Sequence, residues 1–323
     1  MKQVLYRNFG NPPEVLEVIE SDISVLAAGQ ARIKVLRAPI NPSDVAQIAG
    51  QYGVKPELPA IAGLEGLGRV VEVNGNGIEE GQLVLLPSVG TWATEIIGAI
   101  DQLVPLPEGD LDQLSMLRVN PATAYLLLTE FVALNPGDWV ILSAANSGVG
   151  SYIVQLAKAR GINLVCVVRR ESAVADLKQA GANVVLVDGI DLAEQVREAT
   201  GTEMKLALDA VAGDTAGRLA ETLEDAGTLV LYGGMSAKPA SIGIDPILFR
   251  DVRVRGFWLL PWILETSKEE QTKVYGELTM AVAAGILHAP IERQFSLDEI
   301  TEAVTYAMAG ERSGKVLLAP NGV

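Results

Sequence analysis

Residues 139–150 read WVILSAANSGVG, and this stretch decides the fold. Its first half, residues 139–144, is almost wholly apolar, as in a strand that is buried on both faces of a sheet. A turn of small residues follows, and residues 149–160 then have the apolar spacing of an amphipathic helix. Strand, small-residue turn and helix together predict the first unit of an alternating α/β domain.

The same alternation continues along the chain. We predict strands at residues 164–168, 184–187, 206–210, 228–232 and 252–257, and helices at residues 172–180, 192–200 and 215–223. Apolar strands that alternate with helices indicate a parallel sheet with helices on both faces. Six strands in this rhythm predict a doubly wound, Rossmann-type dinucleotide-binding domain over residues 119–261.

The front of the chain has a different pattern. Short runs of Val, Ile and Leu alternate with Gly and Pro clusters, which favours a β-rich, barrel-like domain over about the first hundred residues. Near the C-terminus we expect helices at residues 269–284 and 297–309 and a strand at residues 315–318. This tail is too small to fold alone, so we predict that it packs on the front half. The β-rich domain then comprises residues 1–118 and 262–323.

Composition excludes several classes of protein. The 323 residues include 25 basic and 40 acidic side chains, for a net charge of −15, which disfavours binding to nucleic acid. The single Cys166 can form no disulfide within the chain, and one Cys with one His leaves little for a zinc site. No apolar run is long enough to span a bilayer, and the N-terminus resembles neither a signal peptide nor a transit peptide. We therefore expect a cytoplasmic protein that binds neither nucleic acid nor a membrane.

The small-residue turn is the predicted cofactor site. It lets a pyrophosphate approach the backbone, and the N-terminus of the following helix favours an anion. The turn is not a complete Gly-x-Gly-x-x-Gly motif, because Ala145 and Ser147 take the first two glycine positions and only Gly150 fits the third. Tight packing alone is the alternative. Because the turn lies in a domain of six predicted strand–helix units, we favour a nucleotide site. It is formed by Asn146, Ser147, Gly148, Val149 and Gly150.

The second predicted strand ends in Arg169 and Arg170. In enzymes that use NAD, an acidic residue at this position binds the ribose 2′-hydroxyl and would repel a 2′-phosphate. Two guanidinium groups instead offer paired donors to a 2′-phosphate, which favours NADPH as the cofactor. The alternative is a solvated pair of arginines, or an ion pair with Glu171.

Six short motifs carry a family resemblance: residues 40–44 (INPSD), 63–68 (GLEGLG), 119–125 (VNPATAY), 146–150 (NSGVG), 232–235 (YGGM) and 255–258 (RGFW). Together they resemble the zinc-free branch of the medium-chain dehydrogenase/reductase superfamily, and within it the mitochondrial-type trans-2-enoyl-CoA (enoyl thioester) reductases. The resemblance implies a Rossmann domain, a β-rich GroES-like catalytic domain, and reduction of the C2=C3 double bond of enoyl thioesters by NADPH. Zinc-dependent members carry Cys and His ligands where this chain has residues 41–44 and 64–65, so no metal is expected. The alternative is that Asp44 and Glu65 act as carboxylate ligands; we favour a structural hydrogen-bonding pair.

The resemblance also implies roles for single residues. It places the proton donor on Tyr52, within the motif GQYG of residues 50–53. A phenol can protonate the α-carbon or bond the developing enolate oxygen; the alternative is a ring packed on the edge of the barrel. Cofactor contacts are implied for Asn120, Tyr232, Gly233, Gly234, Met235, Phe257, Trp258, Leu259 and Lys315, and a substrate pocket for Trp258 and Trp262.

Three functions stay open at this stage. The leading hypothesis is an NADPH-dependent enoyl thioester reductase. The alternative is a zinc-independent NADPH:quinone or α,β-unsaturated carbonyl oxidoreductase, and the third is a non-catalytic NADPH-binding protein. Acidic thioester carriers require a local basic patch, for which Arg250, Arg253, Arg255 and Arg312 are candidates. The predicted apolar strand at residues 252–257 lies at the sheet's edge, and we expect it to pair with its counterpart in a homodimer.

Overall fold

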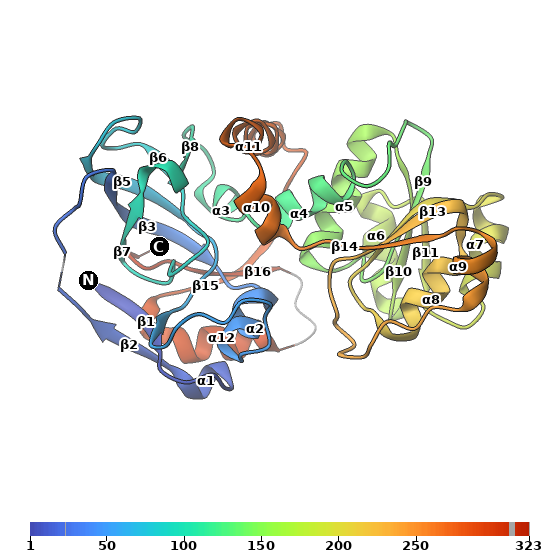
Figure 1. Ribbon diagram of the computed structural model, residues 1–323, viewed down its shortest axis with the longest axis horizontal. Coiled ribbons are helices and arrows are strands. Elements are labelled where there is room, and N and C mark those ends of the chain that lie inside the picture. The colour runs from blue at the N-terminus through green and yellow to red at the C-terminus, as the bar shows by residue number, and fades with distance from the viewer. Residues whose placement is uncertain (23, 310–313, 323) are drawn as a thin grey trace. The chain divides into compact units, whose positions relative to one another are not determined.

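The computed structural model describes residues 1–22, 24–309 and 314–322 of the chain. It divides into two compact units, Met1–Val119 with Thr272–Val323, and Asn120–Gln271 (Figure 1). The sequence places the second boundary near residue 262, whereas α10 (Leu259–Glu265) and the start of α11 (Lys268–Ala283) stay with the central unit. The Gln271 side chain explains this, because its amide donates hydrogen bonds to the carbonyls of Ile263 and Thr266.

The central unit, Asn120–Gln271, contains a six-stranded parallel sheet in the order β11-β10-β9-β12-β13-β14. The order reverses beside β9, which is the first of these strands along the chain, so the predicted doubly wound fold is confirmed. The strands are β9 (Trp139–Leu142), β10 (Asn163–Val168), β11 (Val184–Val187), β12 (Met204–Asp209), β13 (Leu223–Leu231) and β14 (Arg253–Gly256).

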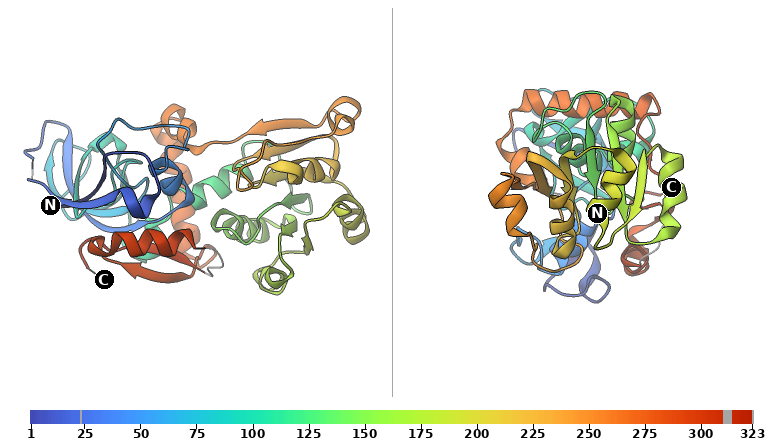
Figure 2. Two further views of the ribbon diagram at one scale, coloured as in Figure 1. Left: turned by 90° about the horizontal axis from the view of Figure 1, so that it is seen from below. Right: turned by 90° about the vertical axis from the view of Figure 1, so that its right-hand side faces the viewer.

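Helices cover the two faces of this sheet (Figure 2). The helices of the central unit are α4 (Asn120–Leu127), α5 (Gly148–Arg160), α6 (Val174–Ala180), α7 (Leu192–Thr200), α8 (Gly213–Glu221), α9 (Ile244–Phe249) and α10. Three of them end at a glycine in the left-handed conformation, Gly161, Gly181 and Gly201. Cys166 lies within β10, where burial raises the pKa of its thiol to about 12, so a structural role fits it.

The other unit, Met1–Val119 with Thr272–Val323, is β-rich as predicted. Its long strand β3 pairs antiparallel with β5, β7 and β16, so the C-terminal tail does pack on the front of the chain. The helix α12 (Ile300–Met308) adds buried side chains to the same core. The strands are β1 (Lys2–Tyr6), β2 (Leu16–Glu20), β3 (Gln30–Pro39), β4 (Ala60–Ile61), β5 (Leu67–Asn74), β6 (Leu83–Leu85), β7 (Glu95–Ala99), β8 (Val104–Leu106), β15 (Ile291–Phe295) and β16 (Lys315–Leu318).

Two strands differ from the sequence-based expectation. The strand β14 lies at the edge of the sheet as predicted, but the expectation of an apolar strand is wrong, since all four of its residues are exposed. The reason is its sequence, RVRG, which offers only one apolar side chain. The strand β15 was not expected, because IERQF lacks an apolar pattern, and it forms by parallel pairing with β16.

No helix in the described part of the chain is long and apolar enough to cross a membrane.

Candidate cofactor and catalytic site

The turn between β9 and α5 has the geometry of a phosphate-binding turn. Ser147 is the N-cap of α5, and its hydroxyl accepts a hydrogen bond from the Gly150 N–H at 3.1 Å. Any side chain on Gly150 would collide with the backbone of Ala145, which explains why only the third glycine of the motif is retained. The 13-residue helix therefore begins directly at the turn, and its N-terminal dipole favours an anion there.

Asn120 lies beside this turn, although it is distant in sequence. It is the first residue of α4 and is buried. A Cβ atom on Gly148 would lie 3.1 Å from the Asn120 Nδ2, so the side-chain amide packs directly against the start of α5. The structure thus brings together two groups of predicted cofactor contacts.

Arg169 and Arg170 follow the carboxyl end of β10, the strand next to β9. Both are exposed, and Arg170 precedes the short 3₁₀ helix η2 (Glu171–Ala173). Within the described residues, Arg169 forms no hydrogen bond or ion pair through its side chain. Its guanidinium group is therefore available to a phosphate near the turn.

The loop after β13 holds Tyr232, Gly233, Gly234 and Met235. Burial, together with the nearby Asp209 carboxylate, raises the pKa of Tyr232, so its phenol stays protonated. A Cβ atom on Gly233 would lie 2.9 Å from the Ala210 carbonyl oxygen, so glycine is required for this close approach. The loop therefore crosses the carboxyl end of β12, the edge where parallel sheets bind ligands.

The predicted aromatic contacts follow the edge strand β14. Phe257 packs edge-on against Phe131, with ring centroids 5.9 Å apart. Trp258 is 37% exposed and is the N-cap residue of α10, in which Leu259 is buried and Trp262 half-buried. Trp258 therefore presents apolar surface to solvent within this unit.

Tyr52 and Lys315 belong to the other unit. Tyr52 is half-buried in the loop between α2 (Pro42–Ile48) and β4. Gly50, just before it, has φ +71°, and a Cβ atom there would lie 2.9 Å from the Phe9 ring, so the loop needs glycine at this point. Lys315 begins β16, and its Nζ donates a hydrogen bond to Asn41 Oδ1 at 2.5 Å.

A buried polar network surrounds Asn41. The Asn41 amide donates to Glu65 Oε1 at 2.6 Å, and the Asn41 backbone N–H donates to Asp44 Oδ2 at 2.7 Å. Asp44 and Glu65 also accept from the backbone N–H groups of Leu64 and Val119. Burial raises the pKa of Asp44 to about 7 and that of Glu65 to about 8, although the Lys315 ammonium group acts in the opposite direction on both.

Comparison with known proteins identifies the family. Residues 27–108 match the alcohol dehydrogenase GroES-like domain, and residues 148–272 match the zinc-binding dehydrogenase family. The human mitochondrial enoyl-[acyl-carrier-protein] reductase is 34% identical over 98% of this chain and 88% of its own length. The Dictyostelium discoideum enzyme of the same name is 34% identical over 98% and 94%. The chain belongs to the family of the mitochondrial enoyl-[acyl-carrier-protein] reductases.

Solved structures show two kinds of similar protein. The Etr1p/NADP/crotonyl-CoA complex matches this reductase-family chain with a TM-score of 0.86 and 30% identity, over 98% of this chain and 99% of that one. The quinone oxidoreductase of Pseudomonas syringae pv. tomato DC3000 has a TM-score of 0.88 and 25% identity, over 99% of both chains. The medium-chain dehydrogenase/reductase resemblance is thus confirmed, with both enoyl and quinone reductases among the similar structures.

The residues present do not fit zinc, despite the name of the matching family. No group of three His, Cys, Asp or Glu side chains within the described residues is arranged to hold a metal. Asp44 and Glu65 already accept hydrogen bonds on both carboxylate oxygens. This member of the reductase family therefore has a hydrogen-bonded network at the positions where zinc-dependent relatives are expected to bind their metal.

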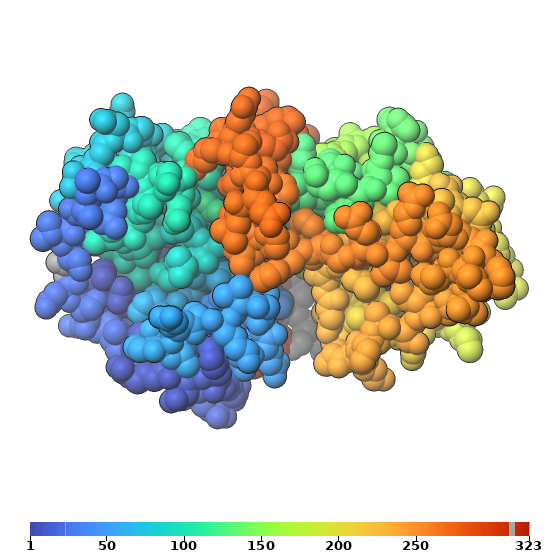
Figure 3. Space-filling model, in the orientation of Figure 1, coloured from blue at the N-terminus to red at the C-terminus, as the bar shows by residue number. Residues whose placement is uncertain are grey.

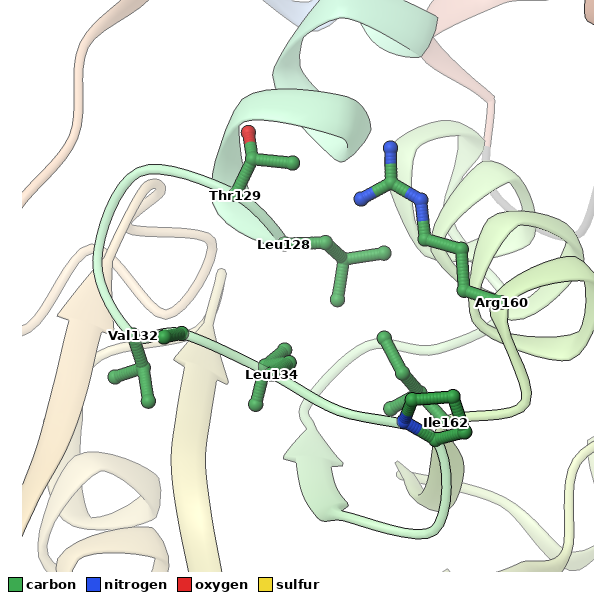
Figure 4. Close-up of a pocket in the computed structure, with 8 residues that line it drawn as sticks. Leu128, Thr129, Val132, Leu134, Arg160 and Ile162 are labelled. Carbon is green, nitrogen blue, oxygen red and sulfur yellow. The ribbon is translucent and has the colours of Figure 1, made fainter.

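A pocket of about 450 Å³ lies elsewhere in the central unit (Figure 4). It is bordered by the C-terminal ends of α4 and α5 and by the loops that enter β9 and β10. These are the amino ends of the strands, opposite the nucleotide turn. Helix C-termini disfavour anions. The one arginine that lines the pocket, Arg160 at the C-terminal end of α5, has its guanidinium group 4.6 Å from the centre of the Tyr125 ring of α4. The pocket is therefore not the cofactor site.

The three described candidates for a basic patch each have a partner within the central unit. Arg250 donates hydrogen bonds to the carbonyls of Leu223 and Ala220, so it fastens the end of α8. Arg253 lies 3.5 Å from Asp251, and Arg255 stacks on Phe131. The fourth candidate, Arg312, lies outside the described residues.

Sequence reasoning missed two polar residues beneath the nucleotide turn, Ser143 and Asp209. Both are buried, at the ends of β9 and β12. The available signal for Asp209 was a charged residue directly after the apolar run of residues 206–208, but its partner Ser143 lies 66 residues away in sequence.

Proposed function

We propose that this protein reduces the C2=C3 double bond of 2-enoyl thioesters with NADPH. The observation that carries the proposal is the nucleotide turn, with Asn120 beside it and Arg169–Arg170 directly after the neighbouring strand β10. The chain is also 34% identical to an enoyl reductase over nearly its whole length. The turn, Asn120 and the Tyr232–Met235 loop would hold the dinucleotide, and the arginine pair would bind its 2′-phosphate. For Lys315, the family resemblance implies a further contact with the cofactor.

When bound, NADPH supplies the hydride that adds to the β-carbon. The addition builds negative charge on the α-carbon and on the thioester oxygen. We assign Tyr52 as the acid that delivers the proton to the α-carbon, since a neutral phenol near neutral pH can both stabilise an enolate and protonate it. Trp258 and Trp262 would contact the acyl chain through their apolar ring surfaces.

The test is a side-by-side measurement of NADPH oxidation with crotonyl-CoA, a longer enoyl-CoA and benzoquinone, with NADH as the control cofactor. We expect turnover of the enoyl thioesters with NADPH. Turnover of benzoquinone alone would support the alternative, a zinc-independent NADPH:quinone or unsaturated carbonyl oxidoreductase, which the quinone oxidoreductase of similar structure favours. Cofactor binding without turnover of any acceptor would support a non-catalytic protein.

We also propose that the protein is a homodimer joined along β14. Among the described strands, β14 pairs only with β13, so its outer edge is unpaired. The helix α9 lies in the orange part at the right of Figure 3. Its apolar side chains Ile244, Leu248 and Phe249 are exposed. A hydrogen bond from the Val252 N–H to the Pro246 carbonyl keeps α9 beside the start of β14.

A further inference from the structure

Asp209 is the last residue of β12, and its side chain is completely buried, with 0% exposure. Its Oδ1 accepts hydrogen bonds from the Ser143 hydroxyl at 2.6 Å and from the Val211 N–H at 2.8 Å. Its Oδ2 accepts one from the Ala212 N–H at 3.0 Å. The carboxylate therefore has donors on both oxygens, and none of them belongs to its own strand.

These hydrogen bonds join three loops at one edge of the sheet. Ser143 begins the nucleotide turn after β9, and its oxygen also accepts from the Ala210 N–H at 2.9 Å. The Ala210 and Val211 carbonyls in turn accept from the N–H groups of Met235 and Ser236, in the loop after β13. One buried carboxylate thus fixes the turn after β9 to the loop after β12, which carries the loop after β13.

The loop after β12 is held in a strained conformation. Ala212 has φ 61° and ψ −151°, a region that is normally open only to glycine. Such strain persists only where surrounding contacts hold it, and here the Asp209 Oδ2 bond holds the strained residue directly. Strain of this kind is typical of functional sites, and the carboxyl edge of a doubly wound sheet is where ligands bind.

The position of Asp209 indicates which part of a dinucleotide depends on it. The arginine pair that would bind the adenosine 2′-phosphate follows β10, on one side of the turn. The loops that Asp209 holds follow β12 and β13, on the other side. Since a dinucleotide extends across the sheet from one half to the other, these loops would meet the nicotinamide half.

We propose that Asp209 is a positioning residue for the nicotinamide half of the cofactor. It is too deeply buried to touch the cofactor, and acts by fixing the turn after β9 and the loops after β12 and β13 in one arrangement. The inference rests on the proposed function, because it takes NADPH as the ligand.

The test is the Asp209→Asn variant, which keeps the size of the side chain but replaces one acceptor oxygen by a donor. We expect the Kd for NADPH to rise about 10- to 100-fold, in line with the loss of one or two hydrogen bonds to a charged group. The Kd for adenosine 2′-monophosphate, which needs only the arginine pair, should change by less than about twofold. Amide hydrogen exchange should quicken in residues 143–150 and 210–212 and not in the core strands.

A matched control is Asp138→Asn. Asp138 also accepts from a backbone N–H, that of Asn135, but it lies at the amino end of β9, away from the turn. This variant should bind both ligands like the wild type. A second variant, Ser143→Ala, removes the hydroxyl that links the two loops, and it should also raise the Kd for NADPH. It keeps the proposal testable if Asp209→Asn does not fold.

The outcomes separate the two proposals. A wild-type protein that does not bind NADPH refutes the proposed function before any variant is made. If the wild type binds NADPH and the Asp209→Asn and Ser143→Ala variants bind it equally well, the role of Asp209 is refuted and the proposed function is not. Equal losses of NADPH and adenosine 2′-monophosphate affinity also overturn it, because they would indicate a general loosening of the domain.

Discussion

Tyr52 is the residue on which the proposed chemistry most depends. The Tyr52→Phe variant deletes one hydroxyl and keeps the ring, so the fold and NADPH binding should be retained. If the phenol delivers the proton, kcat for enoyl thioesters should fall about 10²- to 10⁴-fold, the usual range for general acid catalysis. Both kcat and kcat/KM should fall, because the interaction strengthens in the transition state.

Tyr306→Phe is the control for Tyr52. It also deletes a phenolic hydroxyl, one that donates to Glu292 near the protein surface, and it should leave turnover unchanged. Benzoquinone reduction should depend less on Tyr52, since the reduced quinone can take its protons from water. Full enoyl turnover in Tyr52→Phe would show that the ring is a packing residue.

Arg169 and Arg170 carry the expected preference for NADPH. Replacing either by Ala removes charge-assisted hydrogen bonds to the 2′-phosphate, each worth about 1.5–3 kcal/mol, or roughly 10- to 100-fold in Kd. NADH has no such phosphate, so its Kd should hardly change. Titration of both cofactors checks this, with Arg197→Ala, an exposed arginine in the last turn of α7, as the control. Equal losses for both cofactors would exclude a 2′-phosphate site.

At the scale of single elements, the helix α2 depends on a buried capping box. The Asn41 side chain and the Asp44 carboxylate close the first turn of this helix reciprocally. The Asn41 amide also bonds Glu65 and Lys315, so a local cap is part of a network that reaches β16. The start of α2 is therefore tied to the protonation of two buried carboxyl groups.

This network predicts a dependence of stability on pH. Burial raises the pKa of Asp44 to about 7 and that of Glu65 to about 8, whereas both titrate near about pH 4 in the unfolded chain. Between these values the folded protein binds more protons, so the free energy of unfolding falls as pH rises. Their stabilisation is complete below about pH 4 and is lost as pH rises through about 7 to 8.

Urea unfolding between about pH 5 and pH 8 tests this in wild type and Glu65→Gln. At pH 5 the variant should be less stable than wild type, since Gln accepts one hydrogen bond fewer. The free energy of unfolding of the variant should fall less steeply with pH than that of wild type, and the two slopes should differ by up to about 1.4 kcal/mol per pH unit. Glu108→Gln, at an exposed carboxylate paired with Arg69, should keep the wild-type slope. Parallel pH profiles for wild type and Glu65→Gln would contradict the raised pKa.

The elements differ in how far the sequence could predict them. Strands β9 and β10 have continuous apolar runs and are almost wholly buried, so local pattern and final environment agree. The strand β15 has no such pattern, and its pairing with β16 supplies what its sequence lacks. The link between Ser143 and Asp209 joins residues far apart in sequence, and neither residue's neighbours indicate the other. Contacts of this kind appear only once the sheet is formed.

At the scale of the whole molecule, charge works against association. Each copy carries a net charge of −15, so two copies repel each other at low ionic strength. Added salt screens this repulsion beyond about 10 Å at 0.1 M, whereas buried apolar contacts are little affected. A dimer joined through α9 and β14 should therefore become tighter as salt rises.

The dimer prediction is tested by Phe249→Glu. Phe249 is 72% exposed on α9, and burying such a ring against a second copy contributes about 1.5–3 kcal/mol at each of two symmetric positions. A carboxylate there would lose that contribution and add repulsion, so the dimer Kd should rise at least about 100-fold. Light scattering should give twice the 34.2 kDa chain mass for wild type and the single mass for the variant. Met280→Glu, at an equally exposed (73%) apolar side chain on α11, should remain dimeric. A wild-type mass of one chain at every concentration would refute the dimer, and loss of the dimer in both variants would place the interface elsewhere than β14.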